Sequence, residues 1–171
     1  MLSPFGTPET ERRFLVGSAW PSHVRPQAIR QGYLPTLSGL TLRIRWTSDL
    51  GTVTVKTPAL LGSRWETEWP LLPAVALALL DLCPHPPIEK LRRVVEHDGL
   101  TWEIDEYLGR HAGLVVAEVE LAHPLQQFQS PDWLGQEVTG IAELSNSRLA
   151  RTPSLEPAWA AVAARGLKRA C

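Results

Sequence analysis

The sequence predicts an α+β fold in which about eight antiparallel strands form a sheet with one charged face, and helices pack outside it. Three observations point to this class. Short runs alternate charged and apolar residues, turn residues separate several of these runs, and two other runs are rich in apolar residues with alanine. Alternation with a period of two places successive side chains on opposite faces of a strand. If such strands close into a β-barrel, the charged face lines its interior.

The length and composition fit one domain. The chain has 171 residues, of which 44% are hydrophobic and 20% are charged, and a chain of this kind can bury a core without disulfides or metal staples. We find no internal repeat and no linker-like tract. We therefore expect a single domain over residues 1–171.

The strands are expected where the alternation is clearest. Ser48-Asp49-Leu50-Gly51 lies between two alternating runs, and Asp98-Gly99 lies between two others. Turn residues in these positions indicate antiparallel hairpins. The expected strands are residues 9–16, 29–34, 40–47, 52–57, 63–69, 88–97, 100–107 and 113–121.

The remaining segments divide into loops and helices. The stretch from residue 17 to the strand at 29 is rich in proline and polar residues, and we expect a loop or a short helix there. Residues 131–135 are expected to form a structured loop. Residues 70–82 change to a helical composition, and residues 156–168 fit an amphipathic helix despite Gly166.

Charge and hydropathy argue against several classes of partner. The net charge is −1 and the isoelectric point is near 6.5, so no general field attracts nucleic acid or an anionic membrane. The longest apolar run, residues 71–82, is too short to span a bilayer. No apolar stretch typical of a signal peptide is visible at the N-terminus, and the two cysteines fit a reducing compartment. We expect a soluble, cytoplasmic protein.

The charged face is the most informative feature of the sequence. In most of the expected strands two residues of like charge share one face, and apolar residues occupy the other. The basic members are Arg13, Arg43, Arg45, Lys56, Lys90 and Arg92. The acidic members are Glu9, Glu11, Glu66, Glu68, Glu103, Asp105, Glu118 and Glu120.

Two interpretations of this face are open. Charged residues that alternate with apolar ones usually form the solvated side of a half-buried sheet. A face that serves solubility, however, mixes signs and uses Ser, Thr and Gln freely, whereas here acid pairs and base pairs lie on separate strands. Inside a barrel, such acids need divalent cations and such bases need an anion. A phosphate chain with its metal ions satisfies both.

Several other tryptophans, arginines and histidines have patterns that favour a structural or surface position over a functional one. Trp65, Trp69 and Trp102 fall on the apolar sides of their runs, so we expect them in the core. Arg12 and Arg93 fall on the side opposite the charged face and are expected at the surface or against a helix. The five histidines show neither HxH nor HExxH spacing, so we expect no zinc site.

Several short motifs occur together in one order. The first is ETERRFLV, and it is followed by IRQGYL, LRIRW, VTVKT, RWETEW, IEKLRR, WEIDEY, GLVVAEVEL, PDWLGQEVT and SNSRLA. With these motifs the chain resembles the CYTH superfamily, also called triphosphate tunnel metalloenzymes, whose opening strand has the pattern E-x-E-x-K. The resemblance covers about residues 9–150, with the helix 156–168 beyond it. It implies a closed antiparallel tunnel with a charged lining and outer helices.

The resemblance also implies roles for individual residues. Glu9 and Glu11 match the opening metal-binding acids, and Glu118 and Glu120 match the late acidic pair of a site for Mg²⁺ or Mn²⁺. The basic residues that match phosphate-binding positions are Arg13, Arg43, Arg45, Lys56 and Arg92. Lys90 matches a lysine near the hydrolytic water that is proposed as a base in some members. Tyr33 matches a tyrosine near the tunnel mouth, and Glu66, Glu68, Glu103 and Asp105 match further lining acids.

The chain departs from the family pattern at two positions. Arg13 stands where the family usually has lysine, which keeps the charge but changes its reach and hydrogen-bond geometry. Leu144 precedes Ser145-Asn146, in a motif where the family often has an aromatic residue. The first departure bears on rate or substrate preference, and the second on structure.

The resemblance is strongest to the short bacterial branch, and it leaves three functions open. The leading one is metal-dependent hydrolysis of inorganic triphosphate to diphosphate and phosphate. Thiamine triphosphatase, another organic-triphosphate hydrolase or an adenylate cyclase is the second, and a non-catalytic module that binds polyphosphate or nucleotide is the third. We expect a small triphosphate as the ligand and no nucleic-acid or membrane partner, and a homodimer is left open.

Overall fold

The computed structural model describes residues 10–17, 19–36, 39–57, 66–123 and 125–168. The chain divides into two compact units, one made of residues 1–8 and 29–88 and the other of residues 9–28 and 89–171. Each unit is described by itself. Glu9 and Trp65, two residues singled out above, lie outside the described residues.

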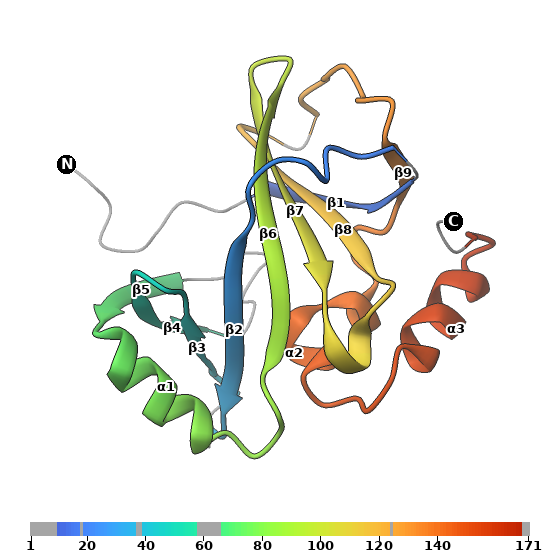
Figure 1. Ribbon diagram of the computed structural model, residues 1–171. Helices are drawn as coiled ribbons and strands as arrows, with labels where there is room; N and C mark the ends of the chain where they lie inside the picture. The colour runs from blue at the N-terminus through green and yellow to red at the C-terminus, as the bar shows by residue number, and fades with distance from the viewer. Residues whose placement is uncertain (1–9, 18, 37–38, 58–65, 124, 169–171) are drawn as a thin grey trace. The chain divides into compact units, whose positions relative to one another are not determined.

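The first unit is an antiparallel sheet covered by one helix (Figure 1). Its strands follow one another in chain order, and neighbours in sequence pair with each other. The helix packs against the two middle strands, β3 and β4. The elements are β2 (Gln27–Leu34), β3 (Thr41–Trp46), β4 (Gly51–Lys56), β5 (Glu66–Leu71) and α1 (Pro73–Asp81).

Small residues allow helix α1 to lie close to this sheet. Ile44 is buried with Ala76 and Leu80 of the helix. A Cβ atom on Gly51 would stand 2.5 Å from the Ala76 Cβ, and one on Gly32 would stand 2.7 Å from the Cys83 Sγ. Both distances are too short for any side chain, so glycine at these positions sets how closely the helix packs.

The second unit is a five-stranded antiparallel sheet in the order β6-β7-β8-β1-β9. It joins the N-terminal strand to strands that follow about a hundred residues later, with Arg13 opposite Glu118 and Glu11 opposite Glu120. Its strands are β1 (Thr10–Val16), β6 (Ile88–His97), β7 (Leu100–Tyr107), β8 (Val115–Leu121) and β9 (Leu134–Glu137). Its helices are α2 (Asn146–Leu149) and α3 (Glu156–Ala164), with 3-10 turns η1 (Gly109–His111) and η2 (Ala142–Leu144).

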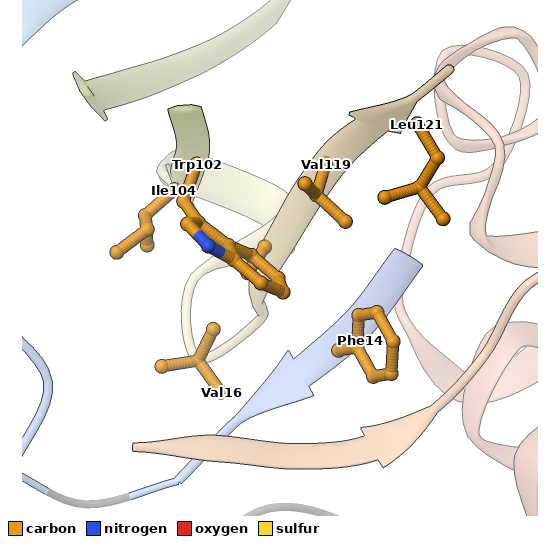
Figure 2. Packing of buried hydrophobic residues seen from close by; sticks show 7 residues of the cluster. Phe14, Val16, Trp102, Ile104, Val119 and Leu121 are labelled. Carbon is orange, nitrogen blue, oxygen red and sulfur yellow. The ribbon is translucent and has the colours of Figure 1, made fainter. Parts of the chain in front are cut away.

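An aromatic cluster holds one face of this sheet. Figure 2 shows Trp102, Phe14 and Val119 directed toward one another from three strands. Trp102 is fully buried, and its ring centroid lies 5.9 Å from that of Phe14 and 5.5 Å from that of Trp133. Tilted and edge-to-face arrangements at these distances are favourable. The apolar positions that the alternation predicted in β7 and β8 therefore share one side, which leaves the charged positions of these strands together on the other.

Most of the expected elements are present in the described residues. The turn predicted at Asp98-Gly99 joins β6 and β7, and both residues have positive φ angles, 52° and 72°, as a type I′ hairpin turn requires. Helix α3 ends at Ala164 rather than residue 168 because Gly166, with a φ of 72°, takes the left-handed conformation that ends helices. The prediction that residues 1–171 form one domain is not tested by these features.

Several expectations were wrong or incomplete. Strand β9 was not predicted, and it begins within the expected loop 131–135; its Gly135 lets the chain approach the Leu15 carbonyl so closely that a Cβ would stand 2.6 Å away. Trp69 is 49% exposed instead of lying in the core, because it stands on the edge strand β5, opposite Val53, where one flank of the strand has no neighbouring strand among the described residues. Arg93, on the apolar side as predicted, is buried: its guanidinium lies 4.9 Å from the Trp20 ring and donates to the carbonyls of Ser22 and Val24. None of the described helices is long and apolar enough to cross a membrane.

Candidate functional site

Each unit brings its predicted charged residues together on one face of its sheet. In the second unit the cations Arg13, Lys90 and Arg92 alternate in space with carboxylates. The pairing explains this, because Arg92 lies opposite Asp105, and Glu118 lies between Glu103 on one side and Arg13 on the other. Cross-strand neighbours on one face are close enough for their side chains to interact. The charged face is thus a direct result of strand register.

Asp105 is the centre of the buried part of this face. Its side chain is completely buried and accepts a hydrogen bond of 2.5 Å from the Lys90 Nζ. It also accepts from Arg92, at 2.7 Å from Nε and 2.6 Å from Nη2. Burial alone would raise the pKa of Asp105, but the charges and hydrogen bonds of Lys90 and Arg92 outweigh it and lower that pKa far below its ordinary value. Asp105 is therefore ionised and holds two cations in place.

Arg92 connects Asp105 to the rest of the face. It also donates to Glu103 and, at 3.2 Å, to Glu118. Burial by itself would lower the pKa of Arg92, but the hydrogen bond and charge of Asp105, with Glu103 and Glu118, raise it instead. The guanidinium is thus a fixed, permanently charged group with carboxylates around it.

Arg13 occupies the other end of this network. Its Nε lies 3.0 Å from a Glu118 oxygen and 3.4 Å from a Glu11 oxygen, and its Nη2 donates to the Leu144 carbonyl at 2.8 Å. Burial would lower the pKa of Arg13, but the charges of Glu118 and Glu11 and the hydrogen bond to Glu118 raise it. The arginine fork can reach a carboxylate and a carbonyl at once, which a lysine ammonium does less well. The departure from the family lysine therefore has a structural use, because it ties β1 to the C-terminal segment.

The uncharged side chain of Tyr107 also belongs to this network, although Tyr107 was not among the site residues predicted from the sequence. Its ring lies 5.8 Å from the Lys90 Nζ, and its hydroxyl donates to the Asn146 Oδ1 at 2.8 Å. Burial raises the pKa of Tyr107 well above its ordinary value, and the negative charges of Asp105 and Glu118 raise it further. The phenol therefore keeps its proton and acts as a donor.

The first unit carries a second, smaller network. Arg43 donates to the Thr54 hydroxyl at 3.0 Å and to Glu66 and Glu68, each at 3.2 Å. Thr54 is fully buried, and its hydroxyl donates a hydrogen bond of 2.7 Å to Glu68. Lys56 forms an ion pair with Glu66. The arginine is thus oriented by three oxygen atoms from two neighbouring strands.

Tyr33 and Arg45 complete the predicted residues of this unit. Tyr33 lies opposite Arg43 in the β2–β3 pairing, and Arg45 lies opposite Gln31. The buried Gln31 side chain donates to the Tyr33 hydroxyl at 2.9 Å. These contacts place Tyr33 and Arg45 on the same face as Arg43.

The expected metal ligands are only partly described. Carboxylate oxygens are the donors that Mg²⁺ and Mn²⁺ prefer, and Glu11, Glu118 and Glu120 provide them from the two paired strands β1 and β8. Over residues 10–168, gaps aside, no three acidic, histidine or cysteine side chains already lie close enough to hold an ion. Glu118 is engaged by Arg13 and Arg92, and Glu120 is exposed. The chemistry of these donors fits a divalent metal, and the fourth acid, Glu9, lies outside the described residues.

Three residues that complete these networks were missed in the sequence. Thr54 could have been found, since it shares the face of Lys56 in the TVTVK run. Tyr107 also follows Asp105 at a spacing of two. Asn146, by contrast, lies outside the sheet, and its contact with β7 has no signal in the alternation.

Fixed arginines and lysines on one face of antiparallel strands have the donor chemistry that suits a multiply charged anion. Comparison with known proteins shows the family. The profile of the CYTH domain matches residues 7–152. The chain belongs to the CYTH domain family.

Two curated relatives and one solved structure are informative. An inorganic triphosphatase of Acetivibrio thermocellus is 41% identical over 147 residues, which cover 85% of this chain and 94% of the relative. An inorganic triphosphatase of Nitrosomonas europaea is 32% identical over 146 residues, covering 83% and 96%. A crystal structure of an inorganic triphosphatase matches with a TM-score of 0.66 and 28% identity, covering 86% of this chain and 97% of that one. These likenesses confirm the predicted fold class.

Proposed function

We propose that this chain hydrolyses inorganic triphosphate to diphosphate and phosphate with the help of a divalent metal ion. The observation that carries the proposal is the set of fixed cations, above all Arg43 and Arg92, each held by several oxygen atoms on a charged sheet face. Both curated relatives described above are inorganic triphosphatases, and this chain covers nearly all of their length.

The basic residues bind and orient the phosphate chain. Arginine presents a rigid fork of donors that matches phosphate oxygens, so Arg13, Arg43, Arg45 and Arg92 take the phosphoryl groups, with Lys56 and Tyr33 at further positions. Fixed cations stabilise the charge that spreads over the transferred phosphoryl group, because their positions need no reorganisation during the reaction. The further lining acids Glu66, Glu68, Glu103 and Asp105 hold these cations in place.

The acids Glu9, Glu11, Glu118 and Glu120 would hold Mg²⁺ or Mn²⁺. Such an ion supplies charge neutralisation at the phosphate oxygens and orients the attacking water. Glu118 and Glu120 are the members of this set that we expect to be most sensitive to substitution, because they lie together on β8 opposite Arg13 and Glu11.

Lys90 is the residue proposed to act near the hydrolytic water. Its ammonium lies 2.5 Å from the Asp105 carboxylate, and an opposite charge at that distance favours the protonated form. In this arrangement Lys90 donates a hydrogen bond or a proton. Acting as a base requires the ion pair with Asp105 to open first.

Phosphate release tests the proposal directly. The purified chain is given triphosphate, thiamine triphosphate or ATP, each with Mg²⁺, Mn²⁺ or EDTA. We expect turnover that is fastest on triphosphate and abolished by EDTA. Preference for thiamine triphosphate or ATP would favour the organic-triphosphate alternatives. Absence of turnover, with triphosphate still raising the melting temperature, would leave a binding module.

A paired substitution tests the metal site. Replacement of Glu118 and Glu120 together by glutamine keeps the shape of the side chains but removes their charge. We expect loss of metal-dependent turnover and loss of the melting-temperature increase that the metal ion alone produces. Glu143→Gln, which changes an exposed acid of η2 rather than one of these strands, is the matched control. Full activity of the double variant would show that the metal ligands are elsewhere.

A further inference from the structure

The buried lysine of the candidate site packs against charged and aromatic groups of the neighbouring strand β7. Lys90 has an exposed side-chain fraction of 0%, and it has two partners on β7: the Asp105 carboxylate and the ring of Tyr107. Lys90 and Tyr107 are directly opposite each other in the β6–β7 pairing. A buried ammonium is stable only when such partners are held in place.

Tyr107 is in turn held from outside the sheet. Its hydroxyl donates to the Oδ1 of Asn146 at 2.8 Å, and Asn146 is the first residue of α2. Since the phenol is fully buried and remains protonated, it has no water to replace this acceptor. The hydrogen bond therefore fixes the ring against which Lys90 lies.

The same short segment also holds Arg13. The carbonyl of Leu144, two residues before Asn146, accepts from the Arg13 Nη2 at 2.8 Å. Between these two contacts, the Ser145 side chain caps α2 by accepting from the Arg148 amide and donates to the Ala142 carbonyl. Residues 144–146 are thus a rigid bridge with one contact to β1 and another to β7.

These contacts join the two ends of the charged face. Along the sheet, Lys90 is linked to Arg13 through Asp105, Arg92 and Glu118. Across residues 144–146, the same two cations are linked through Tyr107 and Asn146. Both ends of the network are therefore fixed twice, once by carboxylates and once by the C-terminal segment.

We propose that Tyr107 and Asn146 are positioning residues for triphosphate hydrolysis, and that their hydrogen bond holds the Lys90 ammonium at the place where it acts. This inference rests on the proposed function. Neither side chain needs to touch the substrate. Removal of the bond lets the Tyr107 ring and the Lys90 side chain move, which lowers the rate of the chemical step more than it weakens binding.

Two single variants and their combination test the bond. Tyr107→Phe removes the hydroxyl and keeps the ring, and Asn146→Ala removes the acceptor while improving helix propensity. We expect each to lower kcat about tenfold with KM changed less than about twofold. If one bond is responsible, the double variant is no worse than either single variant. Additive effects, or a kcat within twofold of the parent protein, would overturn the proposal.

A matched control separates positioning from general loosening of α2. Thr152→Val removes the hydrogen bond from the Thr152 hydroxyl to the Leu149 carbonyl at the other end of this helix. We expect it to lower the melting temperature without the fall in kcat. A fall in kcat equal to that of Tyr107→Phe would show that any weakening of α2 suffices, and would refute the specific role of the bond.

Chemical labelling of lysine gives a readout that does not depend on turnover. The full chain is treated with acetic anhydride, and modification of Lys90 is measured by peptide mass spectrometry relative to the exposed Lys168. We expect Lys90 to react about ten times faster in Tyr107→Phe and Asn146→Ala than in the parent chain or in Thr152→Val. Unchanged labelling would overturn the inference, even if the proposed activity is confirmed. If the parent chain shows no triphosphatase activity, the proposed function fails, while labelling still decides whether the bond holds Lys90.

Discussion

Replacement of Asp105 by asparagine tests a buried carboxylate that accepts hydrogen bonds from two cations of the charged face. Asp105 accepts three hydrogen bonds from Lys90 and Arg92, and its side chain is completely buried. Asparagine has the same shape, but one of its two terminal atoms becomes an NH₂ donor that faces other donors. The variant therefore removes the charge between two buried cations and retains at best part of the hydrogen bonding.

The size of the effect follows from these contacts. Loss of about two hydrogen bonds to a charged group, each worth about 1.5–3 kcal/mol, gives about 3–6 kcal/mol. Removal of one partner from a buried ion pair gives a similar range, about 3–5 kcal/mol. A domain of this size changes its melting temperature by about 2–4 °C per kcal/mol, so we expect a decrease of about 6–20 °C.

Urea unfolding at neutral pH measures this loss, with Glu103→Gln as the control. Glu103 also pairs with Arg92, but its side chain is 42% exposed, and exposed pairs contribute about 0–1 kcal/mol. The pH dependence adds a second check. Because the pKa of Asp105 is lowered on folding, its stabilisation is present above the ordinary carboxyl range, near pH 4, and is lost as pH falls further. The difference between parent and variant should therefore shrink in acid. An Asp105→Asn variant as stable as Glu103→Gln would refute the reasoning.

Three further changes have defined outcomes. Arg13→Lys keeps a cation but gives up the contact with the Leu144 carbonyl, so thermal melting should show a loss of about 1–3 kcal/mol; an unchanged melting temperature would mean that the carbonyl contact is dispensable. Burial, together with Arg110, lowers the pKa of the buried His111, so stability should fall as pH drops below about 6.5. Unfolding of His111→Gln should show a flatter pH dependence there, and an identical slope would contradict this. Thr54→Val removes an acceptor from Arg43 and should raise KM for triphosphate several-fold; an unchanged KM would show that Arg43 is oriented without it.

The sheets were largely predictable because alternation is a local signal. Alternate residues are apolar throughout β8 and in β7 as far as Ile104, and these residues form the cluster around Trp102 (Figure 2). The same alternation necessarily placed Glu103 and Glu118 on the other face. Period-two spacing does not tell which strands are neighbours or how their residues are paired. The contacts Arg13–Glu118 and Arg92–Asp105 therefore became visible only with the strand register of the structure.

The elements that were missed depend on contacts distant in sequence. Strand β9 contains only a weak alternation, and it forms because Gly135 can lie against the Leu15 carbonyl. Trp69 was expected in the core because its run alternates correctly, but an apolar side of an edge strand is not always covered. The role of Asn146 could not be read from its own motif, because its partner is a tyrosine on β7.

Because carboxylates already hold the basic side chains, the affinity for an anionic ligand depends on whether a metal cation binds as well. An anion that binds Arg92 competes with Glu118, whose side chain is largely buried, and a buried carboxylate that loses its partner is destabilised. A cation that arrives with the anion removes this penalty, since it gives the displaced carboxylate a new partner. The two affinities are then linked, and each ligand must strengthen the binding of the other by the same factor. On the proposed function, the Arg92 network would therefore bind the metal–triphosphate complex more tightly than either ion alone.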